Sequence, residues 1–177
     1  MKINYKLKLS DFLEYQLYAS SKSKLHNKTI KRTQFFVPVV YIILGIYIFL
    51  TLNRVIGIIS ILLGLLWYIF YPKYAKRRNK KHFEKHIIEN YSNRVDKLIE
   101  LEFTPQFMFE KELTSESKIM VQEIDKLIEL KDYFFVQLKS KLTFVIPKHA
   151  ISDENIFKKK ISEYDVDYVN ELSWKWE

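Results

Sequence analysis

The chain has 177 residues with no cysteine, only three glycines, 16% aromatic residues and a formal net charge of +8. The absence of cysteine excludes a disulfide-stapled secreted domain, a thiol enzyme and a Cys-ligated zinc site, and the aromatic content argues against a disordered or collagenous chain. The length fits one domain of the usual size, or one smaller domain with an appendage.

Charged and hydrophobic residues are segregated along the chain. Residues 1–32 and residues 73–85 each carry a net charge of +6, residues 33–72 carry +1, and residues 86–177 carry −5. The positive excess therefore lies on both sides of a nearly uncharged block, and the C-terminal half is mildly acidic.

A strand is predicted near the N-terminus. Residues 2–9 alternate between polar and apolar side chains, which places on one face of a half-buried strand the residues Ile3, Tyr5, Leu7 and Leu9. Because a single strand is not stable alone, this one has to pair with strands that follow the uncharged block. We therefore expect a split domain, with the block inserted between its first strand and the rest.

A short helix is predicted to follow the strand. Ser10 has the character of an N-cap, and Asp11 and Glu14 would lie in the first turn. The helix is expected to run for about three turns into the basic residues that precede the uncharged block.

Two membrane-spanning helices are predicted in the block. Residues 35–52 and residues 55–72 are each free of charged side chains, and only Asn53 and Arg54 separate them. At a rise of about 1.5 Å per residue each segment spans roughly 27 Å, close to the ~30 Å hydrocarbon core of a bilayer. Two core helices of a soluble domain would need far more surrounding chain, and a signal peptide would be shorter and nearer the N-terminus.

The basic flanks predict the orientation of this hairpin. Because the connection is only two residues long, both flanks lie on one side of the membrane, and the positive-inside rule assigns that side to the cytoplasm. Arg54 is the one charge on the other side. The cations of the flanks are Lys22, Lys24, Lys28, Lys31, Arg32, Lys73, Lys76, Arg77, Arg78, Lys80, Lys81 and Lys85. We expect a two-pass protein of the cell membrane with both termini in the cytoplasm.

Small residues line one face of the second membrane helix. Gly57, Ser60 and Gly64 are spaced so that a neighbouring helix can approach closely. The first helix, through Gly45, is the expected neighbour, and a homodimer contact through the same face is the alternative. We interpret the hairpin as an anchor, because neither helix carries the ionisable groups that an ion pathway or transport site requires.

A basic juxtamembrane helix is predicted over residues 73–91. Its cations could contact acidic lipid headgroups, at about 1 kcal/mol each, or they could serve only to set the orientation. The proposed lipid contacts are Lys73, Lys76, Arg77, Arg78, Lys80 and Lys81. Nucleic acid is not expected as a partner, because residues 86–177 are acidic.

An antiparallel sheet and a final helix are predicted for the cytoplasmic domain, residues 92–177. The hydrophobic period changes to two after Lys97, and the candidate strands centre on residues 99–103, 107–109, 118–122, 124–130, 133–138 and 142–146. The final helix would start at Ser152-Asp153-Glu154, with an apolar side of Ile156, Phe157, Ile161 and Tyr164. Together with residues 1–32 this gives an α+β membrane protein around the hairpin of residues 33–72.

Two short motifs connect the domain with a known family. Lys131-Asp132-Tyr133-Phe134 and Ile146-Pro147-Lys148 stand in the stretch of residues 118–152 that resembles the C-terminal domain of the YcxB-like proteins. The hairpin and the N-terminal strand are also similar to the layout of that family. The resemblance implies a bacterial pleckstrin-homology-like (PH-like) domain, in which a C-terminal helix caps the sheet.

Candidate catalytic groups are few. His82 and His86 would share a helix face, but in the string HFEKH the glutamate does not follow the first histidine directly, as a zinc protease requires. The carboxylate pairs Glu100 with Glu102, and Asp165 with Asp167, would each share a strand face and are interpreted as solvated surface. Every glycine lies in the hairpin, which leaves no glycine-rich phosphate loop. We therefore predict no enzyme, no cofactor and no metal site.

The leading functional hypothesis is a membrane-anchored interaction or scaffold protein that binds a protein or an acidic lipid at the inner leaflet. The alternative is an immunity factor that protects the cell against a membrane-active peptide or toxin, and only the size and the anchoring motivate it. A membrane enzyme that acts on lipid headgroups is a third hypothesis, and it would need a polar interfacial site that the sequence does not offer.

Overall fold

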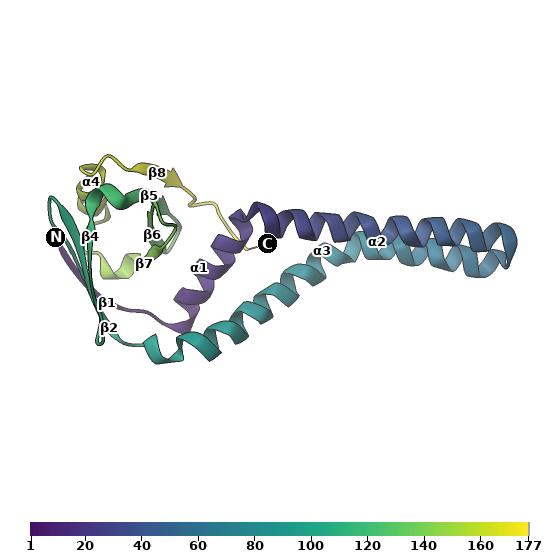
Figure 1. Ribbon diagram of the computed structural model, residues 1–177, viewed down its shortest axis with the longest axis horizontal. Helices are drawn as coiled ribbons and strands as arrows, with labels where there is room; N and C mark the ends of the chain where they lie inside the picture. Colours follow the sequence, from purple (N-terminus) through teal and green to yellow (C-terminus); the bar gives the residue numbers. More distant parts are fainter. Residues whose placement is uncertain (177) are drawn as a thin grey trace. The chain divides into compact units, whose positions relative to one another are not determined.

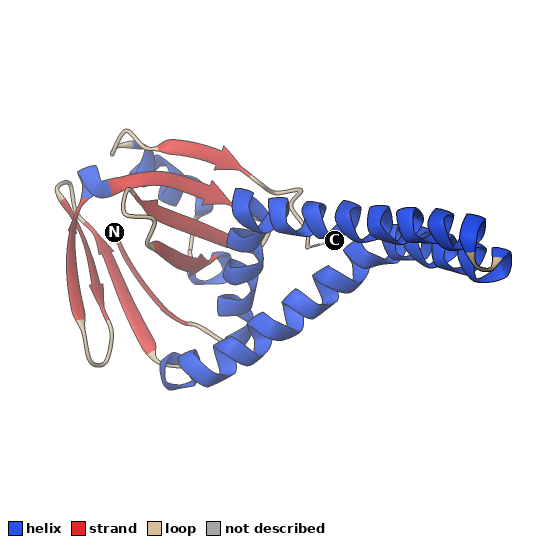
Figure 2. Ribbon diagram, turned by 45° about the vertical axis from the view of Figure 1, so that its right-hand side comes forward, coloured by secondary structure: helices blue, strands red, loops and turns tan. Residues whose placement is uncertain are grey.

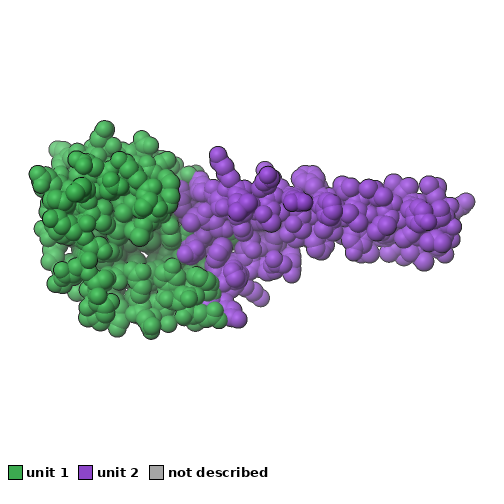
Figure 3. Space-filling model, viewed as in Figure 1, with its two compact units in different colours: residues 1–15, 86–176 green, residues 16–85, 177 purple. Residues whose placement is uncertain are grey.

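The computed structural model describes residues 1–176 and has an α+β fold. Figure 1 gives the order of its helices and strands. The chain divides into two compact units (Figure 3). The first comprises Met1–Tyr15 and His86–Trp176, and the second comprises Gln16–Lys85. The first unit is thus built from two stretches of chain between which the long helices are inserted.

The first sheet contains the N-terminal strand. It consists of β1 (Lys2–Lys6), β2 (Leu98–Phe103), β3 (Phe107–Lys111) and β4 (Glu116–Met120), in that order and with every pair antiparallel. Ile3 lies opposite Leu101 in this sheet, and both side chains are buried. The N-terminal strand therefore pairs with a strand that follows the long helices, as its stability requires.

The second sheet has the order β7-β6-β5-β8. Strands β5 (Ile124–Glu129), β6 (Tyr133–Leu138) and β7 (Thr143–Pro147) are antiparallel, whereas β8 (Asp167–Asn170) pairs in parallel with β5 (Figure 2). The prediction of one antiparallel sheet is therefore corrected in two respects. A 3₁₀ turn over Val121–Glu123 separates β4 from β5, and helix α4 (Glu154–Ser162) supplies the crossover that a parallel strand needs.

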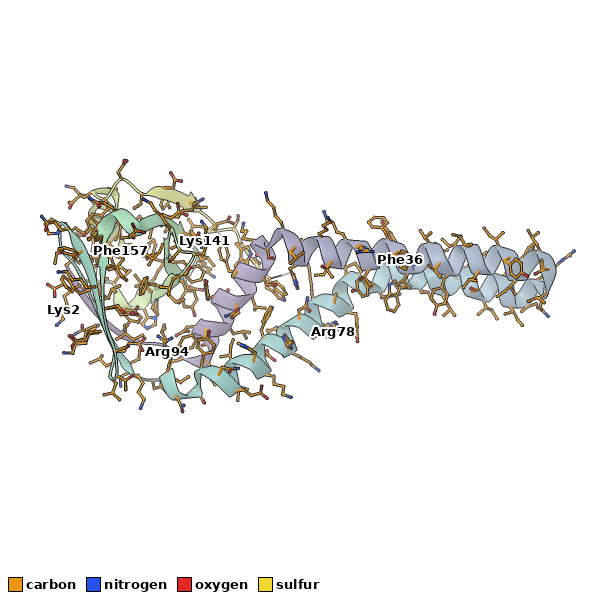
Figure 4. The ribbon with its side chains drawn as sticks, in the orientation of Figure 1. Lys2, Phe36, Arg78, Arg94, Lys141 and Phe157 are labelled. Atoms are coloured by element: carbon orange, nitrogen blue, oxygen red, sulfur yellow. The ribbon has the colours of Figure 1, made fainter. Side chains whose placement is uncertain are left out.

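One aromatic side chain of α4 connects the two sheets. Phe157 is fully buried, with its ring centroid 5.8 Å from that of Phe103 in β2 and 5.0 Å from that of Phe134 in β6. Figure 4 labels Phe157 inside this unit. Burying an aromatic side chain of this size contributes about 2 kcal/mol or more, so α4 is an integral part of the core.

The start of α4 agrees with the sequence prediction, but two residues of its predicted apolar side do not: Ile156 is exposed, and Tyr164 lies beyond the end of the helix at Ser162. The side chain of Asp153 caps the helix by accepting hydrogen bonds from the backbone N–H groups of Asn155 and Ile156, at 2.8 and 3.1 Å. Phe157 and Ile161 are buried, whereas the predicted core residue Ile156 is 61% exposed. A helix of nine residues buries one narrow stripe, and Ile156 lies beside that stripe.

The N-terminal helix begins earlier than predicted. Helix α1 spans Leu9–Lys22, so Leu9 belongs to the helix and not to β1, which ends at Lys6. The predicted cap, Ser10, lies inside the first turn. Instead Asp11 accepts a hydrogen bond from the backbone N–H of Lys8 at 2.8 Å, which is the acidic half of a capping box.

The second unit contains two helices that are long and apolar enough to span a membrane, α2 (Lys24–Thr51) and α3 (Arg54–Tyr91). Only 11% of the most apolar window of each helix is buried. Side chains such as Ile43, Leu50 and Ile69 are 62–74% exposed. Core helices of a soluble domain would have buried these groups, because exposing apolar area to water costs about 25 cal/mol per Å².

The predicted boundary at residue 72 is not the end of a helix. Pro72 lies inside α3, which continues without a break through the basic residues to Tyr91. A proline within a helix leaves the carbonyl four residues earlier without its backbone donor. Here the side-chain amide of Gln34 in α2 donates to that carbonyl, Tyr68 O, at 3.3 Å. This bond compensates the break and allows α3 to continue.

Candidate functional site

The four small residues predicted to pack in the hairpin lie where α2 and α3 meet. A Cβ atom added at Gly57 would lie 2.5 Å from Cβ of Phe49, and one added at Gly45 would lie 2.9 Å from the carbonyl oxygen of Gly57. A Cβ added at Gly64 would lie 3.0 Å from Cβ of Tyr41. The hydroxyl of Ser60 donates to Tyr41 O at 3.1 Å. The glycines therefore allow close contact of the two backbones, which is the usual means of helix association in lipid.

The turn between the two helices is fixed by a cap. Asn53 accepts hydrogen bonds through Oδ1 from the backbone N–H groups of Val55 and Ile56, at 2.9 and 3.2 Å. These bonds satisfy two of the donors that the start of α3 leaves free. The connection is therefore short and defined, and α2 and α3 are antiparallel neighbours.

Basic side chains cover the ends of both helices that are remote from this turn. The six predicted lipid contacts on α3, Lys73, Lys76, Arg77, Arg78, Lys80 and Lys81, are all exposed. Figure 4 labels Arg78 on this part of α3. The side-chain amide of Asn79 lies 3.1 Å from Nε2 of His26 in α2, so the basic segments of the two helices are in contact.

A shallow, widely open groove runs along α2 from its basic part into its apolar part, and the residues that line it all belong to this helix. It has a volume of about 740 Å³. Its basic half contains Lys24, Lys28, Lys31 and Arg32, and its apolar half begins with Phe35 and Phe36. The four cations are exposed. Figure 4 labels Phe36 on this helix. The groove therefore combines positive charge and apolar surface on one side of one helix.

The positive charge of this unit is not balanced locally. The sequence has no Asp or Glu between Glu14 and Glu84. Within residues 1–176, none of the six cations on α3 or the four on α2 named above forms an ion pair. Such a surface attracts anions, because there is no internal carboxylate to compete for the ammonium and guanidinium groups.

A buried carboxylate in the first unit is a second candidate, and it was not recognised in the sequence. Glu129 of β5 is 2% exposed. Lys148 and Lys158 donate to its two carboxylate oxygens at 2.7 and 2.6 Å, and the hydroxyl of Tyr168 donates to the second of these. Lys148 also pairs with Glu154 at 2.9 Å.

The environment of Glu129 keeps this side chain ionised. Burial disfavours the charged carboxylate, but the hydrogen bonds from Lys148, Lys158 and Tyr168 outweigh that effect and lower the pKa of Glu129 to about 2. The hydrogen bond to Glu129 in turn raises the pKa of Tyr168 to about 12. With Glu154 included, two carboxylates face two ammonium groups, and each polar group already has a partner. The cluster therefore joins β5, α4 and β8 around one buried carboxylate.

The two sequence motifs lie side by side in the structure. Tyr133 pairs with Pro147 across β6 and β7, and the backbone N–H of Lys148 donates to Asp132 O at 3.0 Å. The hydroxyl of Tyr133 donates to Asp11 at 2.9 Å, which links β6 to the first turn of α1. Phe134 lies against Phe157, and Lys148 bonds to Glu129. The motif residues therefore hold the fold together.

The two histidines on α3 and most of the paired carboxylates are exposed. His82 and His86 are exposed on α3, and no group of three or more His, Cys, Asp or Glu side chains within residues 1–176 could hold a metal ion. Glu100 pairs with Lys2 at 2.8 Å on the outer face of β2. Asp165 lies in a turn with a φ of 55°, so the expectation that it shares a strand face with Asp167 is wrong.

Part of the site could have been found in the sequence. A helical spacing indicates one stripe of α2, formed by Lys24, Lys28, Lys31 and Phe35. The lipid contacts predicted from the sequence, in contrast, all lie on α3. Glu129 interrupts an apolar run and so marks a buried charge. Its lysine partners come from distant segments, and no local sequence pattern identifies them as partners of Glu129.

Comparison with known proteins supports the resemblance seen in the motifs. Residues 103–159 match the model of a family described as YcxB-like protein, so the predicted similarity of the C-terminal domain to this family is confirmed. The matched segment extends from the end of β2 into α4 and contains Glu129, Lys148 and Lys158. No curated protein and no solved structure matches the chain.

Proposed function

We propose that the protein is a two-span membrane protein that holds a PH-like domain at the cytoplasmic face of the cell membrane, where it acts as an interaction module at an acidic lipid surface. One observation carries this proposal. Two apolar helices with exposed side chains end in ten exposed cations, four on α2 and six on α3, that form no ion pair within residues 1–176.

The same cations support the orientation. The helices are antiparallel and joined by a two-residue turn, so both basic segments lie at one side of the hydrocarbon core. Positively charged segments stay in the cytoplasm, and each cation near an anionic leaflet contributes about 1 kcal/mol to binding. We therefore propose that the turn at Asn53 lies outside the cell and the domain inside.

The arrangement of the first unit supports the PH-like assignment. Strands β1 to β7 pair with one another only in antiparallel fashion, in two sheets. Helix α4 follows β7 and inserts Phe157 between Phe103 and Phe134. Strand β8 is an addition to that arrangement. The family match and the motif contacts lie in the same unit.

The outer face of the first sheet supports binding of a protein. Phe107 and Phe109 project from β3 on this face, and Nζ of Lys118 lies 3.9 and 5.6 Å from their ring centroids. Met120, which is 57% exposed, lies beside them on the edge strand β4. Aromatic and methionine side chains are enriched in protein interfaces.

Membrane extraction tests the anchoring. Washing membranes from producing cells with alkaline carbonate removes peripheral proteins, and we expect the full chain to stay in the pellet. As a control, a variant with Ile43, Leu50 and Ile69 changed to Lys should leave the membrane fraction, because a charged side chain at the bilayer centre costs about 3 kcal/mol. Release of the unchanged chain into the wash would contradict the proposal.

Photocrosslinking tests the interaction role. A photoreactive phenylalanine analogue placed at Met120 is expected to give a defined crosslinked product in cells. The same group at Leu113, which is 76% exposed, should give no such product. Adding Phe107→Ser should abolish the product at position 120. Equal labelling at both positions would argue against a specific interaction surface.

A further inference from the structure

We infer that the groove along α2 binds one anionic phospholipid, with the lipid phosphate held by Lys28, Lys31 and Arg32 and an acyl chain lying along Phe35 and Phe36. This inference rests on the proposed membrane anchoring. It assigns a specific site to a helix whose cations were otherwise expected only to set the orientation.

The groove residues lie in one sector of the α2 surface. At about 100° per residue, the four cations of α2, Lys24, Lys28, Lys31 and Arg32, fall within about 100° of one another around the helix, and Phe35 and Val39 fall in the same sector. The six cations of α3 spread over about 200° by the same measure. A concentrated stripe can hold a single headgroup, whereas a diffuse distribution attracts anionic lipids without selecting one.

The position of the groove along α2 matches the depth of the lipid headgroups. The charge-free part of α2 begins directly after Arg32. Measured along α2 from Phe35, Arg32 therefore lies about 5 Å and Lys28 about 10 Å outside the hydrocarbon boundary, in the layer of the lipid headgroups. Phe35 and Phe36 lie just inside that boundary, where aromatic side chains are enriched.

The chemistry of the groove selects an anionic lipid. The guanidinium of Arg32 can bind two phosphate oxygens at once, and the lysine ammonium groups add charge-assisted hydrogen bonds. Because Asp and Glu are absent from residues 15–83, no side chain of this segment competes with the lipid phosphate. The apolar half is suited to an acyl chain, which a free phosphate or a soluble acidic peptide does not have.

Lipid counting on the intact protein tests the inference. The full chain is purified in an uncharged detergent and examined by native mass spectrometry with dioleoyl phosphatidylglycerol, and with dioleoyl phosphatidylcholine as the neutral comparison. We expect one phosphatidylglycerol to remain bound and phosphatidylcholine not to remain. Retention of both lipids alike would overturn the charge selection.

Matched variants locate the site. The triple variant K28Q/K31Q/R32Q removes two lysines and one arginine from α2, and K73Q/K76Q/R77Q removes the same charges from α3. We expect the affinity of the α2 variant for phosphatidylglycerol to fall at least about tenfold. The affinity of the α3 variant should stay close to that of the unchanged chain. Equal weakening in both variants would mean diffuse attraction and would contradict the inference.

A third variant tests the acyl-chain half of the site. Phe36 is 63% exposed, so Phe36→Ala removes apolar contact area from the groove and little from the protein interior. We expect weaker binding of the dioleoyl lipid, and no competition for the site by glycerol phosphate or inorganic phosphate. Displacement of the lipid by either soluble anion at equal concentration would overturn the inference.

The failure of this inference is distinguishable from failure of the proposed function. Alkaline extraction of the unchanged chain and of all three variants reports on membrane anchoring before any lipid is added. Chains that stay in the membrane but show no preference for the α2 groove refute the lipid site alone. Chains released from the membrane refute the anchoring, and with it the lipid site.

Discussion

Gly57 of α3 lies against the backbone of Phe49 in α2 so closely that an added Cβ would be 2.5 Å from the Cβ of Phe49 and 2.6 Å from its Cα. Distances this short cannot be relieved by turning a side chain, because both partners are close to the backbone. The hairpin can keep its packing only with glycine at this position.

The first prediction concerns this contact. Alanine normally favours a helix over glycine by about 1 kcal/mol, but at Gly57 the overlap should dominate and destabilise the hairpin by about 1–3 kcal/mol. Gly64→Ala is the matched control, because its nearest contact, at 3.0 Å, needs only a small shift. Thermal unfolding of the full chain in detergent measures both. A Gly57→Ala protein as stable as the control would contradict this description of the packing.

The second prediction concerns the carboxylate of Glu129. Glu129→Gln removes the buried carboxylate that Lys148 and Lys158 share and leaves Lys148 only its pair with Glu154, which should destabilise the first unit by about 3 kcal/mol. Asp125→Asn is the control, since its ion pair with Lys141 is screened by solvent and should contribute little to stability. Chemical unfolding followed by tryptophan fluorescence measures the difference.

The pH dependence of the same group has a defined sign. The pKa of Glu129 lies at about 2 in the folded chain, below its ordinary value of 4.5. The carboxylate therefore stabilises the fold above pH 4.5, and this contribution, of the order of 3 kcal/mol, is lost as the pH falls towards 2. The stability difference between the unchanged chain and Glu129→Gln should shrink over that interval. A difference that stays constant from pH 6 to pH 2 would be inconsistent with the ion cluster.

The third prediction concerns Glu110, on the inner face of β3. Burial, with a smaller contribution from the charge of Glu112, raises the pKa of Glu110 to about 7. A raised carboxyl pKa means that the folded state loses stability as the pH rises from about 4.5 to 7, because ionisation is easier in the unfolded chain. Glu110→Gln should therefore be more stable than the unchanged chain at pH 8, by about 1–3 kcal/mol, and similar to it at pH 4. Unfolding curves at the two pH values decide this, and no gain at pH 8 would contradict it.

Local features of the fold could be predicted from the sequence. The alternation around Ile3 and Tyr5 indicated β1, and the Asp153 side chain indicated the start of α4. Both depend on neighbouring residues only. The split of the strands into two sheets and the parallel strand β8 depend on contacts between distant segments. The short strand that begins at Asp167 has too little apolar periodicity to be predicted from the sequence.

The candidate sites were predictable to different degrees. The charge-free segments and their basic flanks are visible as composition, whereas the continuity of α3 through Pro72 depends on Gln34, thirty-eight positions earlier in the sequence. Glu129 needed Lys148, Lys158 and Tyr168 from three other segments, and no local pattern joins them. The basic segments could therefore be predicted from the sequence, whereas the ion cluster around Glu129 could not.

The most direct test of membrane anchoring with a cytoplasmic domain is cysteine accessibility, because the chain has no cysteine of its own. Leu52→Cys places one thiol in the exposed turn between α2 and α3, and Ser140→Cys places one in the exposed turn between β6 and β7. With a membrane-impermeant maleimide, we predict labelling of Leu52→Cys in spheroplasts and labelling of Ser140→Cys only after the membrane is permeabilised. Labelling of Ser140→Cys in sealed spheroplasts, or protection of Leu52→Cys there, would contradict the account.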